Sequence, residues 1–111
     1  MNMARHEFGI MDIAPRLEQE YNGYEPEKYH CISVDDENIV PLLKDLSVIP
    51  CYWNSLRREE KGLAYCGITI IPPNSLGKFI SIIDGKIQFN ELKDMLQKAV
   101  KENKYVIHFG L

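Results

Sequence analysis

The chain has 111 residues, of which 45% are hydrophobic and 26% charged, and its formal net charge at pH 7 is −3. These proportions are typical of one soluble globular domain. No window approaches the ~18 consecutive apolar residues of a membrane span, and the N-terminus lacks an apolar core of signal-peptide length. Because the basic residues are scattered, nucleic acid is not an expected partner. We therefore expect a cytoplasmic protein that acts away from membranes and nucleic acids.

The N-terminal part of the chain divides into an unpatterned stretch and a predicted helix. Residues 1–11 show no hydrophobic period, so we expect a tail or weakly attached segment in front of a single domain over residues 12–111. Asp12 is a typical N-cap residue, and Pro15 falls in the first turn, where its missing N–H does no harm. The predicted helix has one apolar face, made of Ile13, Leu17 and Tyr21.

The next part of the chain predicts a strand, a helix and an ambiguous segment. Residues 29–34, YHCISV, are β-branched and aromatic, which favours a strand. Asn38 is a candidate cap for a second helix. The buried stripe of that helix would be Leu42, Leu43 and Leu46. Residues 48–56 contain Pro50, which restricts this segment to an edge strand or an extended loop. The charged run that follows, RREEKG, is predicted to be a turn.

The C-terminal half carries the clearest patterns. Residues 63–71, LAYCGITII, are almost continuously apolar, as in a central strand covered on both faces. Asn74 or Ser75 is expected to cap a helix with its apolar residues at helical spacing, namely Leu76, Phe79, Ile80 and Ile83. Asn90 is expected to cap a further helix with an unbroken apolar stripe. Residues 104–110, KYVIHFG, close the chain as a strand.

Together these elements predict an α+β (mixed α/β) fold in one compact domain. The sheet is expected to be mixed, with three or four strands, and to pack against about four helices. The pattern leaves the strand order open.

The stretch GLAYCGIT has two glycines, Gly62 and Gly67, at the outer spacing of a phosphate-binding loop. Such a loop must leave a strand, turn in a glycine-rich nest and enter a helix, with a lysine that reaches the phosphates. Here the residues between the glycines are apolar, more strand-like sequence follows, and Ile68 stands where the lysine would be. The spacing is therefore interpreted as chance, and no nucleotide or other cofactor is expected.

Four residues are candidates for nucleophilic chemistry: Cys66, His108, His30 and Cys31. If their strands are neighbours, a cysteine and a histidine could form a reactive thiolate pair. Strand alternation limits this idea, because adjacent His30 and Cys31 point to opposite faces. The ordinary interpretation is that the cysteines are small buried hydrophobes and the histidines bond to backbone carbonyls. The three cysteines lack CxxC spacing, so neither a disulfide framework nor a zinc site is expected.

Aromatic and arginine side chains gather around the predicted edge strand and its turn. They are Tyr52, Trp53, Arg57, Arg58 and Tyr65. Tyrosine, tryptophan and arginine are enriched at the centres of binding interfaces, and an edge strand offers free backbone groups to a partner. The alternative is that Trp53 is a core residue and that the arginines pair with Glu59 and Glu60.

Two functions follow from these observations. The first, which we favour, is a non-enzymatic interaction module of accessory, regulatory or immunity type that docks a macromolecule through the aromatic and arginine edge. Its partner is expected to be another protein or a second copy of the chain. The second is a small enzyme or ligand-binding domain that uses a Cys/His pair.

Overall fold

A six-stranded antiparallel sheet forms the centre of the computed structural model, which describes residues 4–111. The strand order is β2-β1-β6-β5-β3-β4, and every neighbouring pair is antiparallel. The strands are β1 (Arg5–Met11), β2 (Ile32–Asp35), β3 (Pro50–Trp53), β4 (Glu59–Lys61), β5 (Ile68–Ile71) and β6 (Tyr105–Phe109).

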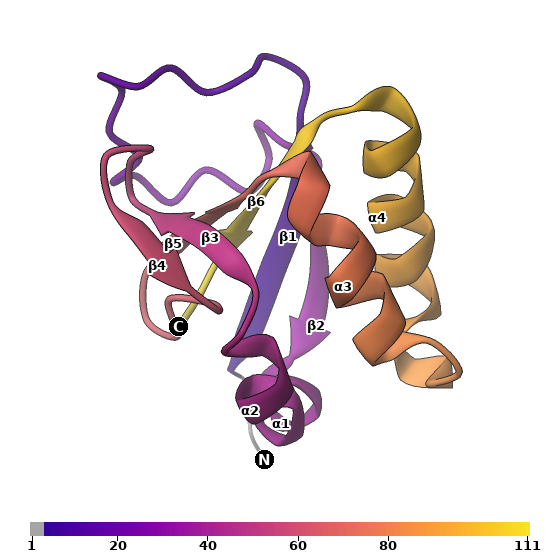
Figure 1. Cartoon of the computed structure of the whole chain (residues 1–111). Helices are drawn as coiled ribbons and strands as arrows, with labels where there is room; N and C mark the ends of the chain where they lie inside the picture. Colours follow the sequence, from indigo (N-terminus) through magenta and orange to yellow (C-terminus); the bar gives the residue numbers. More distant parts are fainter. Residues whose placement is uncertain (1–3) are drawn as a thin grey trace.

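The helices lie on one side of the sheet (Figure 1). Three short pieces in succession form one composite helix, namely α1 (Asp36–Ile39), the 3₁₀ turn η1 (Val40–Leu42) and α2 (Leu43–Leu46). The two longer helices are α3 (Pro73–Ile83) and α4 (Asn90–Glu102), and a 3₁₀ turn, η2 (Ile87–Phe89), joins them. The left-handed conformation of Asn103 ends α4, as asparagine does at many helix C-termini.

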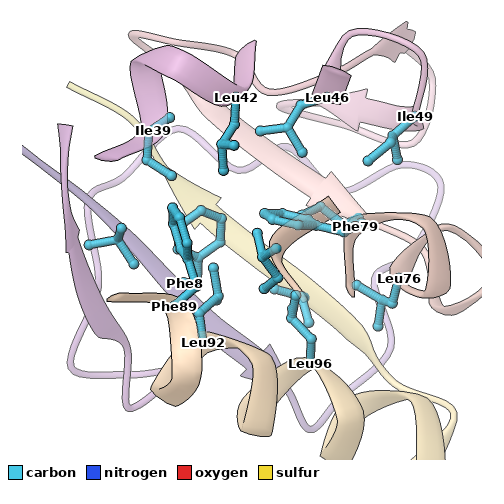
Figure 2. Close-up of a cluster of buried hydrophobic side chains, with 14 of the residues drawn as sticks. Phe8, Ile39, Leu42, Leu46, Ile49, Leu76, Phe79, Phe89, Leu92 and Leu96 are labelled. Atoms are coloured by element: carbon cyan, nitrogen blue, oxygen red, sulfur yellow. The ribbon is translucent and has the colours of Figure 1, made fainter. Parts of the chain in front are cut away.

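The main hydrophobic core fills the space between the sheet and these helices. Phe8 of β1 is fully buried at its centre, and its ring meets the ring of Phe79 edge to face, with centroids 5.8 Å apart. Figure 2 shows the composite-helix side chains on one side of these rings and Leu92 and Leu96 of α4 on the other. The helices are therefore held by apolar stripes at helical spacing, as their sequences predict.

The opposite face of the sheet is covered by the long connection between β1 and β2, residues 12–31, which lies across the sheet from α3 and α4 in Figure 1. This second cluster contains buried side chains of the strands and of the connection, namely Met11, Tyr21, Ile68, Ile70, Ile107 and Phe109. Gly9 allows the close approach, because a Cβ there would lie 2.6 Å from the carbonyl oxygen of Tyr29. The connection therefore buries part of the second face of the sheet as well.

The predicted sheet was wrong in size and type. The structure has six antiparallel strands instead of three or four mixed ones, and it has two long helices and one composite helix instead of about four. Two strands were missed because neither is a continuous apolar run. Arg5–Met11 alternates between faces, and β4 is a short charged edge.

Residues 1–11 were expected to be a tail, and this is corrected for residues 5–11. They form β1, which pairs with β2 on one side and β6 on the other. Residues 1–3 of the expected tail lie outside the described residues. The helix predicted to start after Asp12 does not form. Ile13 is 84% exposed and Leu17 56% exposed, so the apolar period there has nothing to pack against and only Tyr21 is buried.

The middle of the chain needs three smaller corrections. The strand expected at residues 29–34 begins only at Ile32, and the helix expected after Asn38 begins at Asp36 and is broken by η1. Residues 50–53 do form a strand, but β3 is not an edge, since the run expected to be a turn supplies β4 outside it. Pro50 is tolerated because it is the first residue of β3.

The C-terminal predictions are largely confirmed. β5 is a central strand with all four residues buried, although it begins at Ile68 and residues 63–67 of the predicted strand form a loop. β6 and the two long helices lie where the patterns put them. The expected caps are different, however. Pro72 stands at the N-cap of α3 and Phe89 at that of α4, and the Ser75 hydroxyl instead donates to the carbonyl oxygen of Pro50.

Candidate functional site

A groove lies between the long connection and the turn that joins β3 to β4. Its two sides are tied together by backbone and side-chain hydrogen bonds. The Tyr21 N–H donates to the Asn54 carbonyl oxygen at 2.7 Å, and the Asn54 amide Nδ2 donates to the Tyr21 carbonyl oxygen at 3.1 Å. Asn54 has φ 65°, a left-handed conformation that asparagine tolerates and that turns the chain out of β3. The connection is therefore fixed against the turn at this point.

Charged side chains of opposite sign face each other across this groove, which has a volume of about 630 Å³. The connection supplies the carboxylates of Glu18 and Glu20. The β3–β4 turn supplies Trp53, Arg57 and Arg58. We call this hollow the Trp53 groove.

Trp53 is half-buried and held in place from two directions. Its indole Nε1–H donates to the Gly62 carbonyl oxygen at 3.0 Å, and the Arg58 guanidinium lies 5.3 Å from the centre of its ring. Arg58 Nε also pairs with Glu60 at 3.3 Å. Arg57, by contrast, is exposed and makes no ion pair within residues 4–111. The groove therefore contains the fixed Trp53 ring beside two arginines, of which Arg58 is in an ion pair and Arg57 is not.

The structure brings together only three of the five side chains expected at a partner surface. Trp53, Arg57 and Arg58 share the groove. Tyr52 points to the opposite face of the sheet and packs against the second cluster. Tyr65 lies in a different cluster, where its hydroxyl donates to Asp36 Oδ2 at 2.8 Å. The expected pairing of arginine with glutamate is present for Arg58 alone.

A buried polar network lies on the helix side of the sheet, at the end where β1 begins. His6 and His108 are both fully buried, and His6 Nδ1 and His108 Nε2 are 2.9 Å apart. His6 Nε2 lies 2.8 Å from Asp36 Oδ1, and His108 Nδ1 lies 3.1 Å from Thr69 Oγ1. The Ala64 N–H closes the series by donating to Thr69 Oγ1 at 2.8 Å. We call Asp36, His6, His108, Thr69 and Tyr65 the histidine network.

Burial and hydrogen bonding shift the pKa values of two members of this network. Desolvation, with His6 close by, holds the pKa of His108 well below its usual 6.5, so the ring is neutral at pH 7. The hydrogen bond to Asp36 raises the pKa of Tyr65, and desolvation adds to this. Since both imidazoles and Thr69 are fully buried, no solution substrate reaches them. The network is thus a structural feature and not an exposed catalytic set.

Sequence reasoning found His108 but missed its partners. His6 fell in the segment expected to be a tail, and Asp36 was not among the candidate functional residues. One signal was available, since His6, Phe8 and Ile10 alternate with Arg5 and Glu7 as a half-buried strand would. His108 shares a face of β6 with Val106, which packs in the main core, while Ile107 and Phe109 pack in the second cluster.

The Cys/His candidates are not assembled into a reactive pair. No hydrogen bond joins a cysteine to a histidine anywhere in residues 4–111. Burial raises the pKa of Cys31 to about 12, and burial likewise raises the pKa of Cys51 to about 12. Both thiols are therefore protonated at neutral pH. Cys66 and His30 are exposed at separate points of the chain.

We predict that only Cys66 reacts quickly with a thiol reagent in the native protein. Cys51 is buried and the pKa values of Cys31 and Cys51 are strongly raised, whereas Cys66 is exposed. Titration with a chromogenic disulfide at pH 7.5 should show one fast thiol in buffer and three in denaturant. Cys66→Ser should remove the fast phase. A second fast thiol in this variant would contradict the assignment.

Three further observations bear on function. Within the part of the chain that the structure covers, no group of three or more histidine, cysteine or acidic side chains is placed to hold a metal ion. None of the helices over residues 4–111 has the length and apolar character needed to cross a membrane. Comparisons with protein-family models, with curated proteins and with solved structures gave no match. The function of this protein is therefore inferred from its own residues and their geometry.

Proposed function

We propose that this protein is a non-enzymatic, cytoplasmic interaction module, of accessory, regulatory or immunity type, that docks another protein through the Trp53 groove. The observation that carries the proposal is the gathering of Trp53, Arg57 and Arg58 along one groove opposite Glu18 and Glu20. These are the side-chain types that contribute most to binding at interface centres. The indole is also already fixed by its bond to Gly62, so little conformational entropy is lost on docking.

The charges of the groove favour a partner segment that itself carries both signs. Arg57 is available to a carboxylate of the partner, and Glu18 and Glu20 are available to a lysine or arginine. Pairs of this kind increase association rates and exclude partners with the wrong charge order. An apolar partner surface would remove water from these charged side chains without pairing them, and the desolvation cost disfavours binding of such a partner.

Charge reversal at Arg57 is the sharpest test of the proposal. Arg57 is exposed and unpaired within residues 4–111, so Arg57→Glu should leave the fold intact while weakening partner binding at least tenfold, a change of about 1.4 kcal/mol. Tagged protein should first capture the partner from host lysate. The dissociation constant of the purified pair should then be measured by calorimetry for each variant.

Lys101→Glu on α4 is the matched control, because it makes the same charge change at an exposed position that does not line the groove. It should bind as the wild type does. Trp53→Ala is a weaker probe, since losing the bond to Gly62 also affects the fold. A partner that binds wild type and Arg57→Glu equally would refute docking through this groove. Light scattering would show whether the captured partner is a second copy of the chain.

A further inference from the structure

The histidine network is not used by the proposed interface, yet it connects three separate parts of the chain. His6 lies at the start of β1, His108 near the end of β6, and Asp36 is the first residue of α1. The bond between His6 and His108 joins side chains 102 residues apart in the sequence. The network therefore fastens the beginning of β1 to both the last strand and the first helix.

The hydrogen bonds of the network run in one direction when both imidazoles are neutral. Asp36 is an acceptor, so His6 Nε2 carries a proton and His6 Nδ1 must accept one. His108 Nε2–H then donates to His6 Nδ1, and the Thr69 hydroxyl donates to His108 Nδ1. The Ala64 N–H fills the acceptor site of Thr69. Every donor has a partner in this arrangement.

One additional proton is compatible with the same geometry. With His6 charged beside the Asp36 carboxylate, His6 Nδ1–H donates to His108 Nε2. His108 Nδ1–H then donates to Thr69 Oγ1, which as a hydroxyl can accept as well as donate. The series reverses its direction without a shift of any heavy atom, and the Thr69 hydroxyl hydrogen turns away from His108.

A second additional proton is not compatible with the hydrogen bond between His6 and His108. Both imidazoles would then carry protons on all four ring nitrogens, so two N–H donors would face each other across 2.9 Å. Two positive charges would share one carboxylate at a site where both rings have no solvent exposure. The bond between β1 and β6 side chains is lost, and the charges can be solvated only if the strand moves away.

No other charged group within residues 4–111 faces the pair and could compensate for it. α1 contributes Asp36, and the segment before β5 contributes the Tyr65 ring, which lies 5.4 Å from the ring of His6. α4 packs against β1 and β6 with apolar side chains, and Phe8 covers His108. Arg5 and Glu7 neighbour His6 in β1, but alternation turns them to the other face of the sheet.

We propose that the His6–His108 pair is a proton-sensitive latch that holds the first half of β1 to β6 and α1, and that opens when the pair binds its second additional proton. Arg5 and Glu7, on the other face of the same half-strand, line a groove of about 1040 Å³ with Phe109 and Ile68. Opening the latch therefore removes one wall of this groove. The depressed pKa of His108 places the opening below the usual histidine value of 6.5.

Amide hydrogen exchange measures the opening directly. Protection factors for Arg5 to Phe8, corrected for the pH dependence of intrinsic exchange, should be constant near pH 7.5. Below the pH at which the second proton binds, the equilibrium constant for opening should rise by up to about tenfold for each unit that the pH falls. The reason is that the open form holds one more proton. Ile70 and Ile107, in the middle of the sheet, should keep their protection over the same range.

His108→Gln removes one of the two titrating groups while keeping a donor near His6, and it should abolish the pH dependence of the β1 amides. His30→Gln is the matched control, since His30 is the only other histidine and is exposed. It should behave as the wild type does. Because His108→Gln could prevent folding, imidazole ¹⁵N spectra of the wild type provide a second test, in which His108 should become charged only as β1 loses protection. The proposal is overturned if His108 becomes charged while β1 stays protected, or if β1 and the central amides lose protection together.

Discussion

Replacing Phe8 by alanine is expected to lower the free energy of unfolding by about 3–5 kcal/mol. Phe8 has no solvent exposure, its ring contacts Phe79 and His108, and its strand is paired on both sides. Removing the ring leaves a cavity that β1, fixed between β2 and β6, cannot fill by shifting. Urea unfolding followed by circular dichroism measures the change.

Ile13→Ala is the control for the Phe8 substitution. Ile13 is a similarly large apolar residue only a few positions later, but it is 84% exposed, so its loss should change stability by less than about 0.5 kcal/mol. The two variants also test whether residues 5–11 are a core strand or a weakly attached segment. If Phe8→Ala were as mild as Ile13→Ala, residues 5–11 would be the weakly attached segment that the sequence pattern alone predicts.

Asp36→Ala is expected to destabilise the fold by about 1–3 kcal/mol, as leaving a buried hydrogen-bond donor without its acceptor does. The Asp36 carboxylate accepts hydrogen bonds from His6 Nε2 at 2.8 Å and from the Tyr65 hydroxyl at 2.8 Å. Without it, the His6 donor is left unsatisfied at a position with no access to solvent. Unfolding should be measured at pH 7.5, where the latch described above is closed.

The neighbouring carboxylate provides the matched control for this variant. Asp35 is exposed and makes no side-chain capping bond to α1, so Asp35→Ala should be nearly neutral. Asp36→Asn should recover part of the loss, because its amide oxygen still accepts from His6 and its NH₂ can donate to the Tyr65 oxygen. A full loss in Asp36→Asn would show that charge matters more than hydrogen bonding, while equal effects of Asp35→Ala and Asp36→Ala would contradict the buried network.

The elements that sequence analysis found correctly share one property. β5, β6 and the long helices α3 and α4 are buried against their neighbours along most of their length, so their apolar residues follow the period of the element. The predicted helix after Asp12 had the same kind of period, but Ile13 and Leu17 remain in solvent. A local period indicates what a segment could bury, whereas the rest of the fold determines whether a surface is available.

The candidate site shows the same division. The cluster of aromatic and arginine residues near residues 52–58 is visible in the sequence, and Trp53, Arg57 and Arg58 do lie together. Their opposite wall, Glu18 and Glu20, comes from a segment predicted to be a helix. No local pattern relates the two segments, because they meet through tertiary contacts, namely the hydrogen bonds between Tyr21 and Asn54 and the β-bridge between Glu20 and Ser55.

The sequence by itself determined a central strand within residues 63–71, the last strand and the two C-terminal helices, because each depends on a local pattern of burial. Only the tertiary structure decided the strand order, the role of β1 and the histidine network. Antiparallel pairing can join segments that are any distance apart, and the bond from His6 to His108 spans 102 residues. Such a contact is stabilised only when both segments are buried together, so the sequence of either segment alone does not predict it.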